Sequence, residues 1–460
     1  MTNNPADGTK KNIVLIIATI SAFIVPFLVS SINVALPKMA IQFHMEAVVM
    51  TWVNTIYFLA LAMAQVPMGR LADIYGRRKI FILGVAISTA AALTGTQAQS
   101  AGMLLVSRAF QGFGAGMMSN VIIAVLTSVY PSETRGKALG ISMTGTYVGL
   151  IFGPLIGGYL TGRFGWPSIF IVSACFGALL LVLTFLFIKS EWRDARGEKF
   201  DGSGSVIYAV SIALFMYGFS SLPSLPAIAF LFAGMIGLVY FVRRELKSSH
   251  PILDFRLFKS NRIFLFSNIA TLSNYLATYA LTYLLSLYLQ YIKELTPYNT
   301  GIILIWSSIP MVIFTPLAGR LSDRIEPRLV ASTGLAIGCV ALVLLIFLSN
   351  STPIWYIKLA LVLYGTGIGL FSSPNTNAIM GSVDKRMLGV ASGTNGTMRT
   401  SGMMLSMGIT MIIFAVYIGQ VEITRQYYPQ LLVSARVGFG IFTALGVGGV
   451  VAQIAGRRKA

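Results

Sequence analysis

Long apolar runs separated by short polar segments make up most of this sequence. Such a run can cross a bilayer as a helix, because about 30 Å of hydrocarbon requires about 20 helical residues. We place fourteen of them, near residues 13–36, 47–69, 79–98, 103–126, 137–160, 167–188, 203–221, 227–243, 262–291, 299–318, 328–348, 354–377, 388–416 and 432–454. Charged residues form 11% of the chain, against roughly 25% in soluble domains, so we predict an all-α membrane protein.

The basic residues are distributed unevenly between the two sets of loops. Most of the 34 Lys and Arg residues fall in the termini and in the loops on the same side as the termini. The loops on the other side hold Lys38, Arg163, Lys293, Lys358, Arg425 and Arg436. The positive-inside rule therefore predicts a multi-pass plasma-membrane protein with both termini in the cytoplasm. Topology accounts for the net charge of +19, so we expect no nucleic-acid partner.

One short motif occurs twice, as Pro67–Asp73 and as Pro316–Asp323, each time at the cytoplasmic end of a span. Repeats in corresponding positions are typical of transporters built from two related bundles. The separation of the two copies is too long for six spans, and two additional spans account for the excess. We therefore predict a cytoplasmic N-terminus (1–12), a six-helix bundle (13–188), linkers with two inserted spans (189–261), a second six-helix bundle (262–454) and a cytoplasmic C-terminus (455–460).

The sequence contains no pattern that indicates catalysis. Cys175 and Cys339 lie singly in separate spans, which excludes a disulfide framework and favours small buried side chains. The glycine-rich segments Gln111–Gly116 and Gly365–Gly369 lack a P-loop lysine, so nucleotide binding is not indicated. We expect no enzyme activity, no metal and no cofactor. The expected partners are the lipid bilayer and a small-molecule substrate, and the expected state is a monomer.

Three segments have motifs that combine glycine with charged or polar residues. In the loop Gly69–Lys79, a lone acid lies among cations, and the ion pairs it forms can be made and broken during a conformational change. The predicted gating residues of this loop and its repeat are Gly69, Asp73, Gly76, Arg77, Arg78, Gly319, Arg320 and Asp323. The fourth span adds Gln111 and Gly112 beside Arg108.

The fifth span contains small residues at close spacing, namely Gly149, Gly153, Pro154, Gly157 and Gly158. Small residues allow two helices to touch, and proline removes one backbone hydrogen bond. Two interpretations follow, a compliant contact that flexes during transport or ordinary tight packing.

These segments resemble the motifs of the major facilitator superfamily, including LLVSRAFQGFGAG, YPSETRGKALG and the antiporter motif GLIFGPLIGG. The phrase NVALP, the fourteen spans and the segments GTGIGLFSSPNTNAIM and SGTNGTMRTSG resemble its fourteen-span drug:proton antiporters. The resemblance implies two six-helix bundles plus two inserted helices. It also implies a multidrug-type exporter of hydrophobic and amphipathic compounds that works by alternating access with protons as the coupling ion.

The first span departs from that family. Leu28 stands where relatives have an aspartate, and no other carboxylate is predicted deep in a span. Arg108 and Arg399 are the embedded charges, and a buried unpaired guanidinium costs at least about 2.5 kcal/mol. Each arginine contacts either the substrate or polar backbone between helices. The alternative function is therefore a narrower transporter of an anionic or neutral metabolite that uses these arginines without proton coupling.

The resemblance implies that the first and fourth helices of each bundle line the substrate cavity. The predicted cavity residues are Ser30, Asn33, Tyr275, Tyr279, Trp306, Phe371 and Asn375. Aromatic rings with polar tips suit flat apolar compounds. The same aromatic residues could instead pack helices together, and the sequence leaves this open.

Overall fold

The computed structural model describes residues 5–130, 132–193, 195, 197–222, 224–248, 252, 256, 258, 261–322, 324–383 and 387–455. Within them, fourteen long α-helices carry most of the chain, which confirms the predicted all-α fold. They are α1 (Pro5–Gln42), α2 (Ala47–Tyr75), α3 (Arg77–Thr96), α4 (Ala101–Val129), α5 (Ser132–Arg163), α6 (Pro167–Phe187), α7 (Gly202–Ser220), α8 (Leu225–Lys247), α10 (Arg262–Leu287), α11 (Pro297–Ser322), α12 (Pro327–Ile346), α13 (Ile354–Gly381), α14 (Leu388–Tyr417) and α15 (Tyr428–Ala455). A π-helical turn (Tyr288–Ile292) follows α10, and a 3-10 turn (Arg425–Tyr427) precedes α15.

Thirteen of these helices are long and apolar enough to cross a membrane by length and composition. The remaining helix, α10, has 26 residues and is also long enough, at about 39 Å. Its serine, threonine, asparagine and tyrosine side chains make it more polar, and several of them, such as Asn268 and Asn274, are buried inside the protein. The polar side chains of α10 therefore face neighbouring helices. With thirteen further helices able to span a bilayer, the chain is a multi-pass membrane protein.

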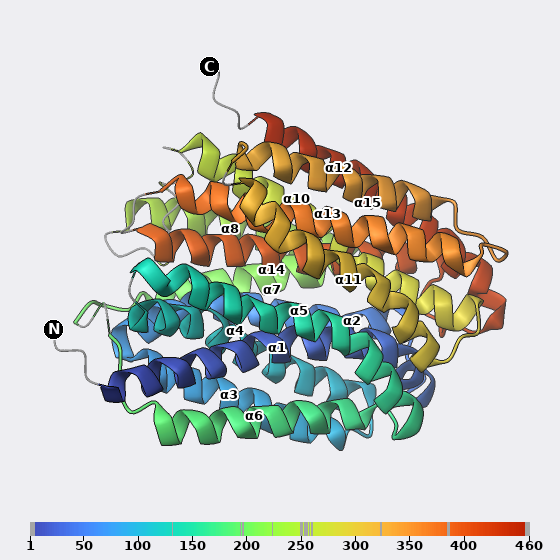
Figure 1. The fold of residues 1–460 in the computed structure, drawn as a ribbon. Coiled ribbons are helices and arrows are strands. Elements are labelled where there is room, and N and C mark those ends of the chain that lie inside the picture. The colour runs from blue at the N-terminus through green and yellow to red at the C-terminus, as the bar shows by residue number, and fades with distance from the viewer. Residues whose placement is uncertain are drawn as a thin grey trace.

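The helices pack into two groups, which lie side by side in Figure 1. In the first, α1 packs against α5, α2 against α4, and α3 against α4 and α6. In the second, α11 packs against α13, α12 against α13 and α15, and α10 against α14 and α15. We call α1–α6 the N-terminal bundle and α10–α15 the C-terminal bundle. The bundles meet where α5 packs against α11, α2 against α14 and α1 against α10.

The long helices run roughly parallel to one another in alternating directions, so α1 begins at the end of the molecule where α15 ends (Figure 1). We call this the terminal end, and it also contains the loop Gly69–Lys79. The other end, which we call the opposite end, contains the turns at residues 43–46, 293–296 and 418–424.

The inserted helices α7 and α8 form a hairpin that contacts both bundles through α7. The Tyr208 hydroxyl donates to the Ala62 carbonyl of α2 at 3.2 Å. On the other side, Gly408 of α14 lies so close to Phe219 that a Cβ added at the glycine would be 2.7 Å from the ring. The hairpin therefore lies against the junction of α2 and α14.

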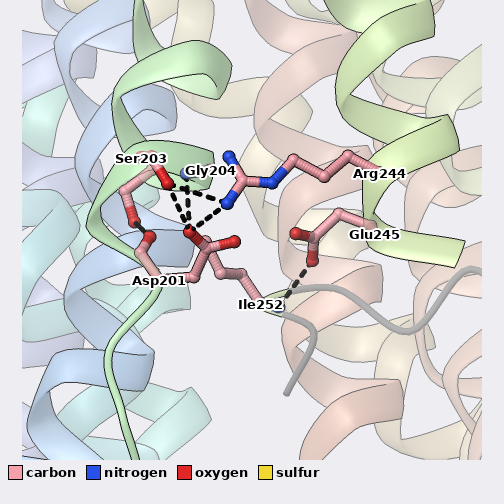
Figure 2. Close-up of polar contacts among 7 residues, drawn as sticks. Asp201, Ser203, Gly204, Arg244, Glu245 and Ile252 are labelled. Carbon is pink, nitrogen blue, oxygen red and sulfur yellow. Dashed lines mark hydrogen bonds and ion pairs between the residues drawn. The ribbon is translucent and has the colours of Figure 1, made fainter. Parts of the chain in front are cut away.

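Polar contacts fix the base of this hairpin (Figure 2). Asp201 caps α7 by accepting a hydrogen bond from the Gly204 amide at 2.8 Å, a contact generally worth about 1 kcal/mol. The same carboxylate oxygen pairs with Arg244 of α8 at 2.8 Å. Glu245 is buried in the last turn of α8 and accepts a hydrogen bond from the Ile252 amide. These contacts hold the start of α7 and the end of α8 together.

Candidate functional site

At the opposite end, side chains of the C-terminal bundle bind backbone and hydroxyl groups of the N-terminal bundle. The Ser286 hydroxyl of α10 donates to the Asn33 carbonyl of α1 at 2.7 Å. The hydroxyls of Thr51 on α2 and Tyr283 on α10 are 2.9 Å apart. All four residues are buried, so these contacts close the space between the bundles.

Two turns of the chain extend this contact at the opposite end. The Ala47 amide donates to the Val421 carbonyl at 3.0 Å. Glu46 and Glu422 form an isolated antiparallel β-bridge, which joins the α1–α2 turn to the segment between α14 and α15. We give one name, the opposite-end gate, to the residues that make these contacts, namely Asn33, Glu46, Ala47, Thr51, Tyr283, Ser286, Val421 and Glu422.

On the terminal side, Arg399 of α14 has an exposed side chain. Arg399 is the one exposed residue of α14 between residues 391 and 415, all of which the structure describes. It lies eleven residues into the helix, or roughly 16 Å along its axis. The next residue, Thr400, donates to Gln65 of α2 at 2.9 Å and is buried, so this part of α14 faces the N-terminal bundle. Arg399 also lies close enough to Tyr147 of α5 for an electrostatic interaction, so its exposed side chain lies between the bundles. We call this exposed region on the terminal side the vestibule.

Arg108 is fully enclosed between α2 and α4. Its Nε atom donates to the Val53 carbonyl at 3.1 Å, and its Nη1 atom donates to the Gln111 side-chain oxygen at 2.6 Å. The guanidinium carbon lies 4.2 Å from the centre of the Tyr57 ring, which is a cation–π contact. Among the described residues, no carboxylate forms an ion pair with it. The guanidinium charge is therefore balanced by dipoles and a ring face.

The enclosed cluster extends to the C-terminal bundle through aromatic rings. Tyr279 of α10 packs on Phe58 of α2, with ring centres 4.9 Å apart, and is close enough to Arg108 for an electrostatic interaction. Three enclosed polar atoms lack a hydrogen-bond partner in the described structure: Nη2 of Arg108, Nε2 of Gln111 and Oη of Tyr279. We call these three residues the donor cluster.

The position where the resemblance to drug:proton antiporters implies an aspartate is apolar. Leu28 is 2% exposed and belongs to the main hydrophobic core. The carboxylates whose side chains the structure describes lie in loops, at helix starts or in the last turns of helices, as Asp73 and Glu245 do. Within this part of the chain, the charges at membrane depth are therefore Arg108 and Arg399.

The small residues of α5 face two helices at once. Gly149, Gly153 and Gly157 lie against α1, where a Cβ on Gly157 would be 2.6 Å from the Ser31 Cα atom. The Ser31 hydroxyl donates to the Gly153 carbonyl at 2.8 Å. Absence of side chains therefore lets the backbones of α1 and α5 touch.

The same segment of α5 also contacts the C-terminal bundle. A Cβ on Gly158 would be 2.5 Å from the Pro297 carbonyl oxygen, and one on Gly301 would be 2.2 Å from the Pro154 carbonyl oxygen. The predicted motif thus lies in the α5–α11 contact between the bundles as well as in the α1–α5 contact. Its role in flexing remains a prediction.

The loop Gly69–Lys79 contains the expected ion pair. Asp73 and Arg77 are 2.8 Å apart, and Arg77 also donates to the Ser128 hydroxyl of α4 at 2.8 Å. Gly76 joins α2 to α3 with φ of +130°, a conformation that side chains rarely adopt.

The segment that follows α6 packs directly on this loop. The sequence did not predict this contact. This segment is the linker 188–198 after α6, where the Trp192 carbonyl accepts a hydrogen bond from the Arg77 amide at 3.0 Å. Glu191 accepts the Arg78 amide at 2.7 Å, and Glu198 forms an ion pair with Arg70. We call the segment 188–198, apart from the undescribed residues 194 and 196, the strap.

The second copy of the loop motif lies at the end of α11. Asp323 lies outside the described residues, and its gating role stays a prediction. Gly319 approaches Ser373 of α13, where an added Cβ would be 3.0 Å from the Ser373 hydroxyl. Arg320 is exposed, and Gly69 in the first copy has open space around it.

The predicted cavity residues do not lie on one surface. The Ser30 hydroxyl bonds to the Pro26 carbonyl within α1 and lies at the α5 contact. Phe371 is buried in a small cluster inside the C-terminal bundle, and Asn375 donates to Thr271 at 2.8 Å in the same bundle. Tyr275 is partly exposed and lies one helical turn nearer the terminal end than Tyr279.

Trp306 lies among exposed apolar side chains of α11. It is 39% exposed and lies on the stripe of α11 that also exposes Ile302, Ile309, Ile313 and Leu317. Its ring contacts Lys358, whose ammonium group is 5.3 Å from the ring centre. An apolar exposed stripe is typical of a surface that faces lipid, and the role of Trp306 as a cavity residue stays a prediction.

Comparison with known proteins identifies the fold and the class of protein. A family model described as the Major Facilitator Superfamily matches residues 18–407. The chain belongs to this superfamily. It is 29% identical over 409 residues to the riboflavin transporter RibZ of Clostridioides difficile, covering 88% of this chain and 89% of that protein. It is 30% identical over 394 residues to the multidrug resistance protein Stp of Mycobacterium tuberculosis strain CDC 1551 / Oshkosh, covering 84% and 73%.

A solved structure supports the same fold. The nucleoside transporter NupG (D323A mutant) aligns with a TM-score of 0.63 and 14% identity, covering 98% of this chain and all of that one. With the family match and the named relatives, the protein is a major facilitator superfamily transporter and not an enzyme.

Several residues of the site were not singled out from the sequence. Tyr57 and Phe58 lie in the apolar run TIYFLALA, and their adjacency to Arg108 depends on the rotation of α2 against α4. The sequence does contain a feature that points to this site. Asn54 and Tyr57 are polar side chains one helical turn apart in a predicted span, where polar groups often mark a functional site.

Proposed function

We propose that this transporter exports amphipathic small molecules from the cytoplasm across the plasma membrane by alternating access. The observation that carries the proposal is the asymmetry between the two ends. At the opposite end, several buried contacts such as Ser286–Asn33 join the bundles, whereas on the terminal side Arg399 is exposed next to the buried Thr400–Gln65 contact. This asymmetry is what one state of an alternating-access cycle requires.

The excess of basic residues at the terminal end supports a cytoplasmic location for that end. The vestibule would then be open to the cytoplasm, the side from which an exporter takes its substrate. The similarity to a multidrug resistance protein supports chemically varied substrates, and the similarity to a riboflavin transporter supports polar aromatic ones.

Membership in the fourteen-span drug:proton antiporters is part of the proposal and rests on sequence motifs and on the inserted hairpin. Proton antiport is the coupling that this membership implies. Leu28 removes the usual titrating group from the first helix, so the coupling is the part of the proposal that most needs a direct test.

The test uses purified protein in liposomes that contain a pH-sensitive dye, with ethidium added outside and protein-free liposomes as the control. We expect ethidium transport accompanied by proton movement in the opposite direction. Ethidium transport without proton movement would remove antiport from the proposal and leave an uncoupled transporter. Failure to transport ethidium would contradict a multidrug type of function.

A further inference from the structure

The donor cluster has more hydrogen-bond donors than acceptors. Arg108 can offer five N–H groups, and the described structure supplies acceptors for its Nε and Nη1 atoms. The Nη2 atom of Arg108 and the Nε2 atom of Gln111 are enclosed without an acceptor. Buried donors normally have a partner, so a group that accepts hydrogen bonds is missing from this place.

We infer that the donor cluster binds a hydrogen-bond acceptor, a carboxylate or a carbonyl edge, on the transported molecule. This inference rests on the proposed function, because it names the substrate class of the same pathway. Two parallel N–H groups of a guanidinium fit the two oxygens of a carboxylate, and the neighbouring amide adds a third donor. The rings of Tyr57 and Tyr279 give the site aromatic walls, which suit an attached planar ring system.

The charges around the site disfavour a permanent cation. Among described residues, no carboxylate forms an ion pair with Arg108, and Leu28 stands where the family resemblance implies an acid. A cation such as ethidium would therefore bind elsewhere in the transport pathway, away from the like charge of Arg108, because repulsion is strong in a medium of low dielectric constant. Arg399 adds a second positive charge in the vestibule along the same path.

The cluster also links substrate binding to the opposite-end gate. Arg108 and Gln111 belong to the N-terminal bundle, whereas Tyr279 belongs to the C-terminal bundle and packs on Phe58. The three groups therefore come together only while the bundles meet at the opposite end. An acceptor that binds all three favours the closed gate, and separation of the bundles divides the cluster and weakens binding, which promotes release.

The donor cluster lies close to a partly exposed part of α10. Tyr275 is partly exposed and Tyr279, one turn further along α10, has its hydroxyl enclosed. The donor cluster thus lies one helical turn beyond an exposed part of the wall. The inference therefore requires the side chains along this turn of α10 to move when the acceptor end of a substrate enters.

The experiment compares two xanthene dyes that share a ring system but differ in charge. Fluorescein carries a free carboxylate, whereas rhodamine 6G is a cation whose carboxyl group is esterified. Transport of each dye is measured in proteoliposomes with the wild-type protein, Arg108→Gln, Arg108→Lys and Arg436→Gln. Arg436 is the matched control because it is exposed at the opposite end and donates to the Ile346 carbonyl, away from the cluster.

We expect Arg108→Gln to reduce fluorescein transport about 10- to 100-fold, the usual effect of losing a charge-assisted hydrogen bond. Rhodamine 6G transport should change less than about twofold, and Arg436→Gln should leave both dyes unaffected. Arg108→Lys keeps the charge but loses the forked geometry, so fluorescein transport should fall to an intermediate level. Arg108→Met loses the hydrogen bonds to Val53 and Gln111 but also removes the cost of burying a charge. The two effects oppose each other, so the variant should melt close to the wild-type temperature while losing fluorescein transport.

Each other outcome contradicts a stated part of the account. If the wild type transports rhodamine 6G but not fluorescein, the proposed function stands and the inference is wrong. Equal loss of both dyes in Arg108→Gln, with a lower melting temperature, would show a structural arginine and overturn the inference. If the wild type transports neither dye, the proposed function fails and the inference fails with it.

Discussion

Two residues of α4 show how closely this transporter packs around its polar centre. Arg108 is enclosed without an ion-pair partner among the described residues, a condition that costs at least about 2.5 kcal/mol for an unpaired guanidinium in a membrane helix. One turn further on, Gly112 lies against the backbone of α2, where a Cβ would be 2.1 Å from the Tyr57 carbonyl oxygen. The glycine therefore permits the close contact that brings Tyr57 over Arg108.

Gly112→Ala should separate α2 from α4 and lower stability. The added methyl group meets a carbonyl oxygen of the backbone, which cannot rotate away, so overpacking should cost about 1–3 kcal/mol. The measurement is the thermal unfolding midpoint in detergent. Gly102→Ala on the same helix is the control, because its nearest atom would be 4.0 Å away. Equal midpoints for the two variants would contradict this account of the α2–α4 contact.

At the scale of elements, the strap and the inserted hairpin form one continuous attachment to the N-terminal bundle. The strap binds the α2–α3 loop through Glu191 and Trp192, and Asp201 then caps α7 and pairs with Arg244. Loop Gly69–Lys79 is thus held by the segment that connects α6 to the inserted hairpin.

Glu191→Ala should loosen the strap. The variant loses a charge-assisted hydrogen bond to the Arg78 amide, which is worth about 1–2 kcal/mol and should raise the undocked population about 5- to 30-fold. The measurement is the rate of tryptic cleavage after Arg193 in the folded protein. Glu294→Ala is the control, since it removes an exposed ion pair with Arg425 at the opposite end. An unchanged cleavage rate after Arg193 would show that the strap does not depend on this contact.

Sequence reasoning predicted the elements better than their contacts. Span positions follow from hydropathy, and the helical fold and the superfamily were predictable because apolar length and glycine-rich motifs are local properties. The rotation of each helix is set by packing among many helices, so the exposure of Trp306 and the approach of Tyr57 to Arg108 were not predictable from spacing. The docking of the strap depends on contacts across more than a hundred residues, as in Arg78–Glu191, which leave no periodic signal.

At the scale of the whole molecule, the central claim is that the two bundles separate and rejoin at the opposite end during transport. The β-bridge between Glu46 and Glu422 joins one bundle to the other and gives a direct way to test this. Directly opposed residues of an antiparallel pair have Cα atoms about 4.5–5.5 Å apart, a separation within the range that a disulfide spans.

The decisive measurement is transport by a Glu46→Cys/Glu422→Cys variant in a background with Cys175→Ala and Cys339→Ala. Oxidation should join the bundles at the opposite end and abolish dye transport, and reduction with dithiothreitol should restore it. The two single-cysteine variants, treated in the same way, should transport normally in both conditions. Full transport by the completely cross-linked protein would contradict alternating access through this gate.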